Sequence, residues 1–163
     1  MDNGELFASV MAVLGSGGTV NLPVNGWSMR PFLMPGRDSV VLSPPGERVR
    51  RGDVVLHRRD DGKYILHRIC RVKPNAFYSV GDAEAKPIEG PLRFDQIKAL
   101  AVAANRKGRH IDFAKSVGWR LFTFLWLLLR PFRPCIMGFV TVLYKIIPTA
   151  KKAGGHENKI EDI

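Results

Sequence analysis

The sequence is poor in features that mark several common protein classes. It has only two cysteines, Cys70 and Cys135, in segments of very different composition, so we expect neither a disulfide framework nor a cysteine-rich zinc site. The four histidines lack a metal-ligand spacing such as an i, i+4 pair on one helix, and we expect no metal and no other cofactor. No uninterrupted apolar run reaches the ~20 residues that a membrane-spanning helix requires.

Acidic residues are missing from one long stretch of the chain. Between residues 114 and 152 there are seven basic residues and no acidic one, in the most apolar part of the sequence. The whole chain has a formal net charge of +10, which favours an anionic partner. Because these basic residues flank apolar runs and do not lie among exposed aromatics of a β-domain, the pattern favours lipid headgroups over nucleic acid.

The 163 residues fit one domain of ordinary size with an appendage. Residues 1–18 predict a short amphipathic helix from Glu5 to Leu14 followed by a Gly-rich linker, and they lack the basic region of a secretory signal. Residues 19–113 contain short β-branched runs separated by Gly, Pro and Asp, which is typical of a mainly β domain. The predicted strands are 19–24, 38–43, 53–58, 63–72, 76–80, 98–105 and 109–113.

Residues 114–150 predict an apolar, basic, membrane-associated helical segment. Its two apolar runs, 121–129 and 135–144, are separated by the sequence Arg-Pro-Phe-Arg-Pro, and prolines interrupt a continuous helix. Each run is about half of a spanning length, so we expect two short helices in the membrane interface or a shallow re-entrant hairpin. A single kinked span and a soluble helical pair packed on the sheet are the alternatives. Residues 151–163 are polar and are expected to be disordered.

The sequence Asp-Asp-Gly at 60–62 predicts a hairpin between the third and fourth strands. A two-residue turn would place His57 and His67 on opposite faces of the sheet. A three-residue loop with Gly62 in the left-handed conformation would place them on the same face.

A serine lies among turn-forming residues in the sequence Gly-Trp-Ser-Met-Arg-Pro, residues 26–31. Such a serine is usually only a loop residue, because its hydroxyl bonds nearby backbone. It becomes a nucleophile when a base removes its proton. His67 is a candidate for that base, since imidazole titrates near neutrality.

Three sequence boxes together resemble the type I signal peptidase superfamily. They are a Gly-x-Ser-Met-x-Pro serine box at 26–31, a Gly-Asp-x-Val stretch at 52–55 and a Gly-Asp box at 81–82. In that superfamily the hairpin's return strand carries the general base, which is lysine in bacterial members and in LexA-type self-cleaving repressors. In the endoplasmic-reticulum and archaeal type it is a histidine followed by arginine, as in His67 and Arg68. The resemblance covers about residues 20–112 and implies a signal-peptidase-like (LexA-like) β-domain.

The resemblance also implies roles for individual residues. Ser28 would be the nucleophile and His67 the general base. Asp82 would be the acid that orients His67, with Glu89 as the alternative, because the sequence departs from the family's pattern just after Asp82. His57 replaces a residue that is usually apolar in the family, and we expect it to be structural. The residues expected to bind substrate are Gly26, Trp27, Met29 and Pro31.

These observations predict a membrane-associated serine endopeptidase that cleaves a signal or leader peptide. The expected partners are a peptide or protein substrate and membrane lipids, with no nucleic acid, and the sequence does not specify an oligomeric state. Basic residues around both apolar runs favour the cytoplasmic face of the membrane, which makes leader removal from a small peptide a candidate reaction. The alternative is a catalytically silent module that binds a peptide or partner with the same fold at the membrane.

Overall fold

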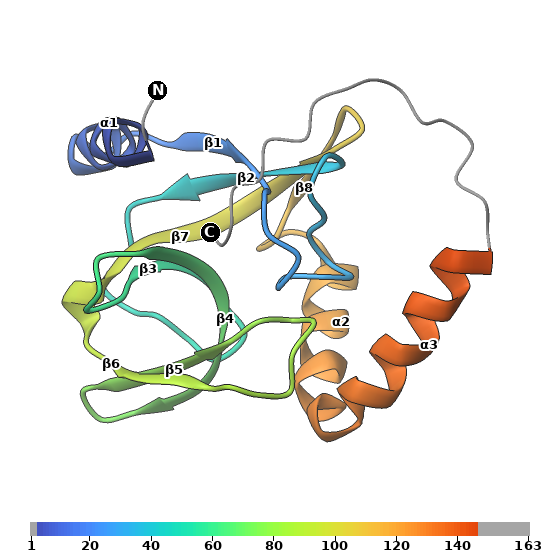
Figure 1. The fold of residues 1–163 in the computed structure, drawn as a ribbon. Helices are drawn as coiled ribbons and strands as arrows, with labels where there is room; N and C mark the ends of the chain where they lie inside the picture. Colours follow the sequence, from blue (N-terminus) through green and yellow to red (C-terminus); the bar gives the residue numbers. More distant parts are fainter. Residues whose placement is uncertain (1–2, 147–163) are drawn as a thin grey trace.

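Eight strands form one antiparallel sheet in the part of the chain that the computed structural model describes, residues 3–146 (Figure 1). The strand order is β1-β2-β7-β3-β4-β5-β6, and β8 also pairs with β7. The sheet is strongly curved, so that β4, β5 and β6 lie below β1 and β2 in Figure 1. The strands are β1 (Val20–Pro23), β2 (Asp38–Ser43), β3 (Val54–Arg58), β4 (Tyr64–Lys73), β5 (Ala76–Val80), β6 (Glu89–Leu92), β7 (Ile97–Arg106) and β8 (Arg109–Asp112).

The prediction of a mainly β domain is confirmed. Each of the seven predicted strands lies within one residue of its observed bounds. The strand that the sequence did not reveal is β6, because its Gly90-Pro91 pair is typical of a turn. Proline is tolerated there because β6 is at the edge of the sheet, where a missing N–H breaks no pairing.

Helices flank the sheet at two opposite ends (Figure 1). The predicted N-terminal helix is confirmed as α1, and the two predicted short C-terminal helices are confirmed with their break at the prolines. The predicted disorder of residues 151–163 lies outside the described residues. The helices are α1 (Asn3–Gly15), the 3-10 turn η1 (Phe94–Gln96), α2 (Val117–Leu128), the 3-10 turn η2 (Arg130–Phe132) and α3 (Arg133–Ile146).

The hydrophobic core lies between the curved sheet and helices α1 and α2. Strand β2 alternates strictly between buried and half-buried residues, as expected for a strand with one face on a core. Val10 and Leu14 of α1 are buried in the same cluster as Val40 of β2. The ring of Phe7 stacks on Tyr64 with centroids 4.3 Å apart, which attaches α1 to β4.

Helix α2 packs one side against the β-domain and exposes the other. Thr123, Trp126 and Leu127 are buried, and the Trp126 ring meets Phe32 edge-on at 5.5 Å. The opposite side is also apolar. We call it the outer apolar face, and it consists of Val117, Leu121, Phe124, Leu125 and Leu128, which are 42–74% exposed. The spacing of these residues is that of one helix stripe, so α2 is apolar on two sides and only one of them is covered by the described residues.

None of the described helices, taken singly, is long and apolar enough to cross a bilayer. The segments Val117–Leu128 and Arg130–Phe139 meet the length and composition criteria only together, and they are bent by 69°.

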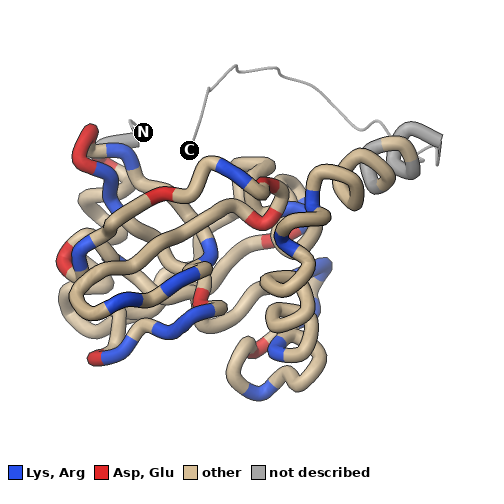
Figure 2. The backbone as a smooth tube through the Cα atoms, turned by 90° about the horizontal axis from the view of Figure 1, so that it is seen from below, with Lys and Arg blue, Asp and Glu red and all other residues tan. Residues whose placement is uncertain are grey.

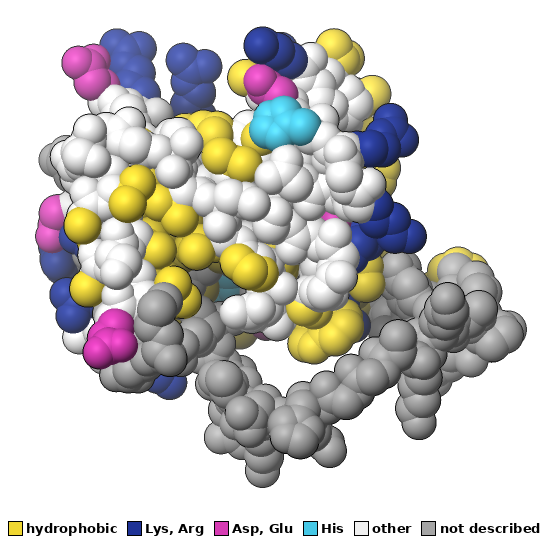
Figure 3. Space-filling view, turned by 90° about the horizontal axis from the view of Figure 1, so that it is seen from above, with side chains coloured by type: hydrophobic (Ala, Val, Ile, Leu, Met, Phe, Trp, Pro, Cys, Tyr) yellow, Lys and Arg dark blue, Asp and Glu magenta, His cyan; other side chains and the backbone are white. Residues whose placement is uncertain are grey.

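Charged side chains are unevenly placed on the surface. The face seen in Figure 3 is largely neutral and apolar, with Lys and Arg side chains at its rim. Viewed from below, Figure 2 shows Lys and Arg positions spread along several strands, while most of the described length of α2 and α3 carries no charge. The net charge of +10 is therefore not gathered on the face of Figure 3.

Arg133 fastens the start of α3 to the β-domain. Its side chain is fully buried and donates to the carbonyl oxygens of Gly81 at 3.0 Å, Glu84 at 2.9 Å and Trp126 at 3.3 Å. Its guanidinium also lies 4.0 Å from the Asp82 carboxylate. One side chain therefore joins both C-terminal helices to the segment that follows β5.

We predict that Arg133→Met lowers the free energy of unfolding by about 3 kcal/mol, because it leaves buried carbonyl groups without donors and Asp82 with one cation fewer. Urea unfolding in mild detergent, followed by tryptophan fluorescence, measures the change. Arg120→Met is the matched control, since Arg120 is exposed on α2 and should change stability by less than about 0.5 kcal/mol. Equal effects of the two substitutions would contradict the anchoring role.

Candidate active site

The β3–β4 hairpin brings two distant histidines to the same face of the sheet. His57 pairs with Ile65, and Val55 pairs with His67. The loop is the three-residue Asp-Asp-Gly sequence with Gly62 at φ 89°, the second of the two geometries considered from the sequence. Because side chains alternate along a strand, a residue and its antiparallel partner share a face, and His57 and His67 therefore lie on one side.

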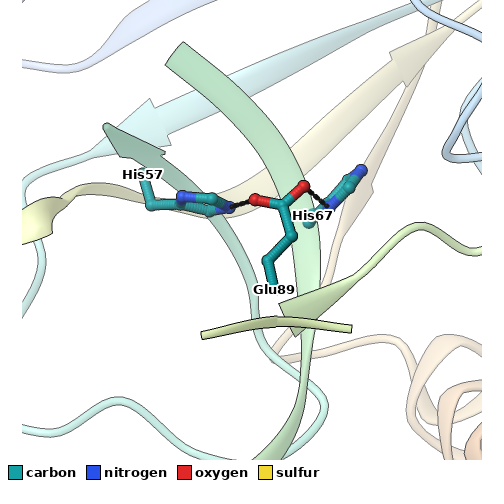
Figure 4. A group of neighbouring side chains, drawn as sticks. All are labelled: His57, His67 and Glu89. Carbon is teal, nitrogen blue, oxygen red and sulfur yellow. Dashed lines mark ion pairs between the residues drawn. The ribbon is translucent and has the colours of Figure 1, made fainter. Parts of the chain in front are cut away.

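Strands β5 and β6 add two polar residues to this face. Ile69 pairs with Ser79, and Ser79 pairs with Glu89. Since Ile69 is two residues after His67, both partners point to the same side of the sheet as the histidines. Figure 4 shows the result, with the Glu89 carboxylate between the two imidazole rings.

The contacts in this cluster are polar and largely buried. Glu89 Oε2 lies 3.4 Å from His57 Nε2, and Glu89 Oε1 lies 3.4 Å from His67 Nδ1. The Ser79 hydroxyl is 3.2 Å from His57 Nε2. The Arg59 guanidinium binds both Glu89 oxygens. Ser79 and Arg59 were not anticipated from the sequence, because their roles depend on strand register and on β6.

Asp82, the first choice for the acid that orients His67, faces the other way. Both its oxygens bind the Arg68 guanidinium at 2.6–3.1 Å, and both side chains are fully buried. Arg68 follows His67 directly, so the alternation of β4 places it on the opposite face. Of the two acids considered from the sequence, Glu89, the alternative, is therefore the one that lies near His67.

Ser28 packs against the backbone beside His67. Val80, the last residue of β5, pairs with Arg68, so Gly81 continues the chain toward the position across from His67. A Cβ on Gly81 would lie 2.8 Å from the Ser28 carbonyl oxygen and 3.1 Å from the Ser28 Cβ, which only glycine permits. The same carbonyl accepts a hydrogen bond from the Ala83 N–H at 2.7 Å.

Ser28 is half-buried, and the described residues include no hydrogen bond between its hydroxyl and His67. His67 Nδ1 faces Glu89, and the other ring nitrogen points away from the carboxylate in Figure 4. The structure thus brings Ser28, His67 and Glu89 to one corner of the domain.

The four residues expected to bind substrate have different environments. Gly26 and Pro31 are half-buried in the loop after β1, whereas Trp27 is 55% exposed with the Arg30 guanidinium 5.0 Å from its ring. Met29 is 2% exposed and belongs to the main core. The expectation that the Met29 side chain lines the substrate site is wrong for this structure, because that side chain fills the interior below the loop.

Burial sets the charge state of the histidines. It lowers the pKa of His67 to about 4, although Glu89 opposes the shift. Burial also lowers the pKa of His57, again against the effect of Glu89. Burial alone would raise the pKa of Glu89, but its hydrogen bonds from Arg59 and the nearby histidines hold it below the usual value. At pH 7 the site therefore contains two neutral imidazoles and an ionised carboxylate.

Two of the four histidines, which have no metal-ligand spacing in the sequence, lie close together with one carboxylate in the structure. One ligand atom from each of His57, His67 and Glu89 lies within 4.8 Å of the other two. The spacing of ten residues between the histidines did not reveal this cluster in the sequence, because the two side chains approach each other across a hairpin and not along a helix.

Comparisons of the sequence and of the structure with known proteins found no match. The chain matches no protein-family model, no curated protein and no solved structure.

Proposed function

We propose that this protein is a membrane-associated serine endopeptidase that cleaves a signal or leader peptide, with Ser28 as the nucleophile. His67 is the general base, and Glu89 holds its imidazole in the required tautomer. One observation carries the proposal: the register of β3 to β6 collects His67 and Glu89 on one face, at the point where Ser28 packs on Gly81.

The proposed chemistry follows from the two ends of the His67 ring. His67 Nδ1 lies 3.4 Å from Glu89 without a hydrogen bond in the substrate-free protein. In the proposed mechanism the two groups close when substrate binds, and Nδ1 donates its proton to Glu89, which leaves the lone pair of Nε2 free to accept the Ser28 proton. The serine oxygen then attacks the substrate carbonyl, and His67 returns the proton to the leaving amine. Water hydrolyses the acyl-enzyme by the same proton transfers. Contacts between nucleophile and base are often long before substrate binds.

The neutral state of His67 supports this role. A general base must be unprotonated before it acts, and burial keeps the His67 ring neutral at pH 7. The imidazolium that forms during attack lies beside the Glu89 carboxylate, which stabilises its positive charge.

Membrane attachment is supported by the outer apolar face of α2. Phe124 and Leu128 are 64% and 63% exposed, and a large exposed apolar surface marks a membrane or protein contact. Arg120 is exposed near the start of α2, where its side chain can reach anionic headgroups.

Catalysis by Ser28 and His67 predicts that Ser28→Ala and His67→Ala each abolish cleavage, because residues that act as one unit lose activity non-additively. His57→Ala is the matched control and should keep most of the activity. A proteome-derived peptide library in detergent micelles, with new N-termini detected by mass spectrometry, supplies the assay. Cleavage that survives in the Ser28→Ala protein would contradict the proposal.

The placement of the acids predicts that Glu89→Gln lowers kcat by about a thousandfold with a small change in KM, since the amide favours the wrong His67 tautomer. Asp82→Asn should mainly lower the free energy of unfolding, because it weakens a buried ion pair. Rates on a library-derived peptide, corrected for the folded fraction, separate the two effects. A larger loss of kcat per folded molecule for Asp82→Asn would restore Asp82 as the orienting acid.

The outer apolar face predicts that the pair Phe124→Asp and Leu128→Asp lowers binding to anionic phospholipid vesicles by about tenfold or more. The control pair Val72→Asp and Phe94→Asp introduces equal charge at two apolar residues outside α2 and α3, in β4 and η1, that are each 42% exposed. Vesicle co-sedimentation measures both proteins, and cleavage of short peptides reports that each is folded. Equal loss in the two pairs would show that charge alone, and not this face, governs binding.

A further inference from the structure

We propose that His57, His67 and Glu89 form a zinc site whose occupation switches off the peptidase. The inhibitory part rests on the proposed function, whereas the binding site rests on geometry alone. Figure 4 shows both rings directed at the one carboxylate from neighbouring strands.

The spacing of the three groups suits a small divalent cation. Zinc binds nitrogen and carboxylate oxygen at about 2 Å in tetrahedral geometry, so two of its ligands lie roughly 3.3 Å apart. The two nitrogen-to-oxygen distances in the cluster are each 3.4 Å, and all three ligand atoms lie within 4.8 Å of one another. A modest closure of the two rings completes a three-ligand site with one open position.

Unmet hydrogen-bonding capacity at the cluster is a second observation. His67 Nδ1 is buried and makes no hydrogen bond, although it faces Glu89. Buried polar atoms nearly always have a partner, and a cation between the rings and the carboxylate would supply one. Two imidazoles with one carboxylate favour zinc over magnesium or calcium, which prefer oxygen ligands.

Arg59 is the built-in competitor for this site. Its guanidinium binds both oxygens of Glu89, so zinc must displace it from at least one of them. The Arg59 side chain is 38% exposed, which leaves it room to move into solvent. Removal of this cation should strengthen zinc binding, whereas removal of a ligand should weaken it.

Zinc on His67 Nδ1 is incompatible with the proposed catalysis. A neutral imidazole that coordinates a metal through Nδ1 carries its remaining proton on Nε2. Nε2 then has no lone pair with which to accept the Ser28 proton. The metal therefore inhibits by fixing the opposite tautomer from the one that Glu89 selects.

Binding is tested on the full chain in detergent micelles, stripped of metal by chelation, using calorimetry with Zn²⁺ and the visible absorption of Co²⁺. We expect one equivalent of zinc, affinity lowered about a hundredfold by His57→Ala and by Glu89→Gln, and affinity raised by Arg59→Gln. His110→Ala is the control variant, since His110 is an exposed histidine on β8, and it should leave zinc binding unchanged. Mg²⁺ in place of Zn²⁺ should give no binding signal. Absence of zinc binding, or binding that His57→Ala does not weaken, would overturn the site.

Inhibition is tested separately by peptide cleavage at increasing zinc. The metal-free protein should be active, and zinc should halve its rate near the measured dissociation constant. His57→Ala should require at least about tenfold more zinc, relative to its own metal-free rate. Zinc that binds without inhibiting, or that activates, would overturn the tautomer argument. A protein that binds zinc at these residues but cleaves nothing in either state would contradict the peptidase proposal and leave the metal site supported.

Discussion

The buried ion pair between Arg68 and Asp82 is the interaction on which the rest of this structure depends. Neither side chain is exposed, so the loss of one partner would leave an uncompensated charge in the interior. Arg68 also donates to the Gly52 carbonyl oxygen and to the Thr123 hydroxyl, and it lies 4.9 Å from the Phe32 ring. The Arg68 guanidinium thus connects strand β4 to both Gly-Asp segments, at 52–53 and 81–82, to helix α2 and to the loop that carries Ser28.

The two faces of β4 carry different groups. Adjacent residues of a strand point in opposite directions, so Arg68 enters the interior network while His67 faces Glu89. The Asp82 oxygens are occupied by Arg68, which leaves Glu89 as the carboxylate available to the histidines. The position of Ser28 depends on both sides, because its carbonyl oxygen contacts the segment that begins with Gly81 and Asp82.

The sequence predicted those features that depend on local chemistry. The β-branched runs and the Asp-Asp-Gly loop located seven strands and left two geometries for His57 and His67, of which the observed three-residue loop is one. Strand β6 escaped detection because the Gly-Pro pair at 90–91 resembles a turn, and without β6 the contact between Glu89 and the histidines has no visible cause. The packing of α2 was also hidden, since its two apolar sides look alike in sequence and only the fold decides which side meets Phe32.

The anchoring of the C-terminal helices fixes their position relative to the β-domain. The Trp126 indole donates to the Asp82 carbonyl oxygen, and Arg133 binds the neighbouring carbonyl groups of Gly81 and Glu84. No flexible tether therefore separates α2 from the segment that supports Ser28. In the proposed membrane-bound state, the nucleophile would sit at a constant height above the lipid surface. For a substrate that extends from that surface, the distance from the membrane to Ser28 would then help to determine which peptide bond is cleaved, together with the substrate sequence.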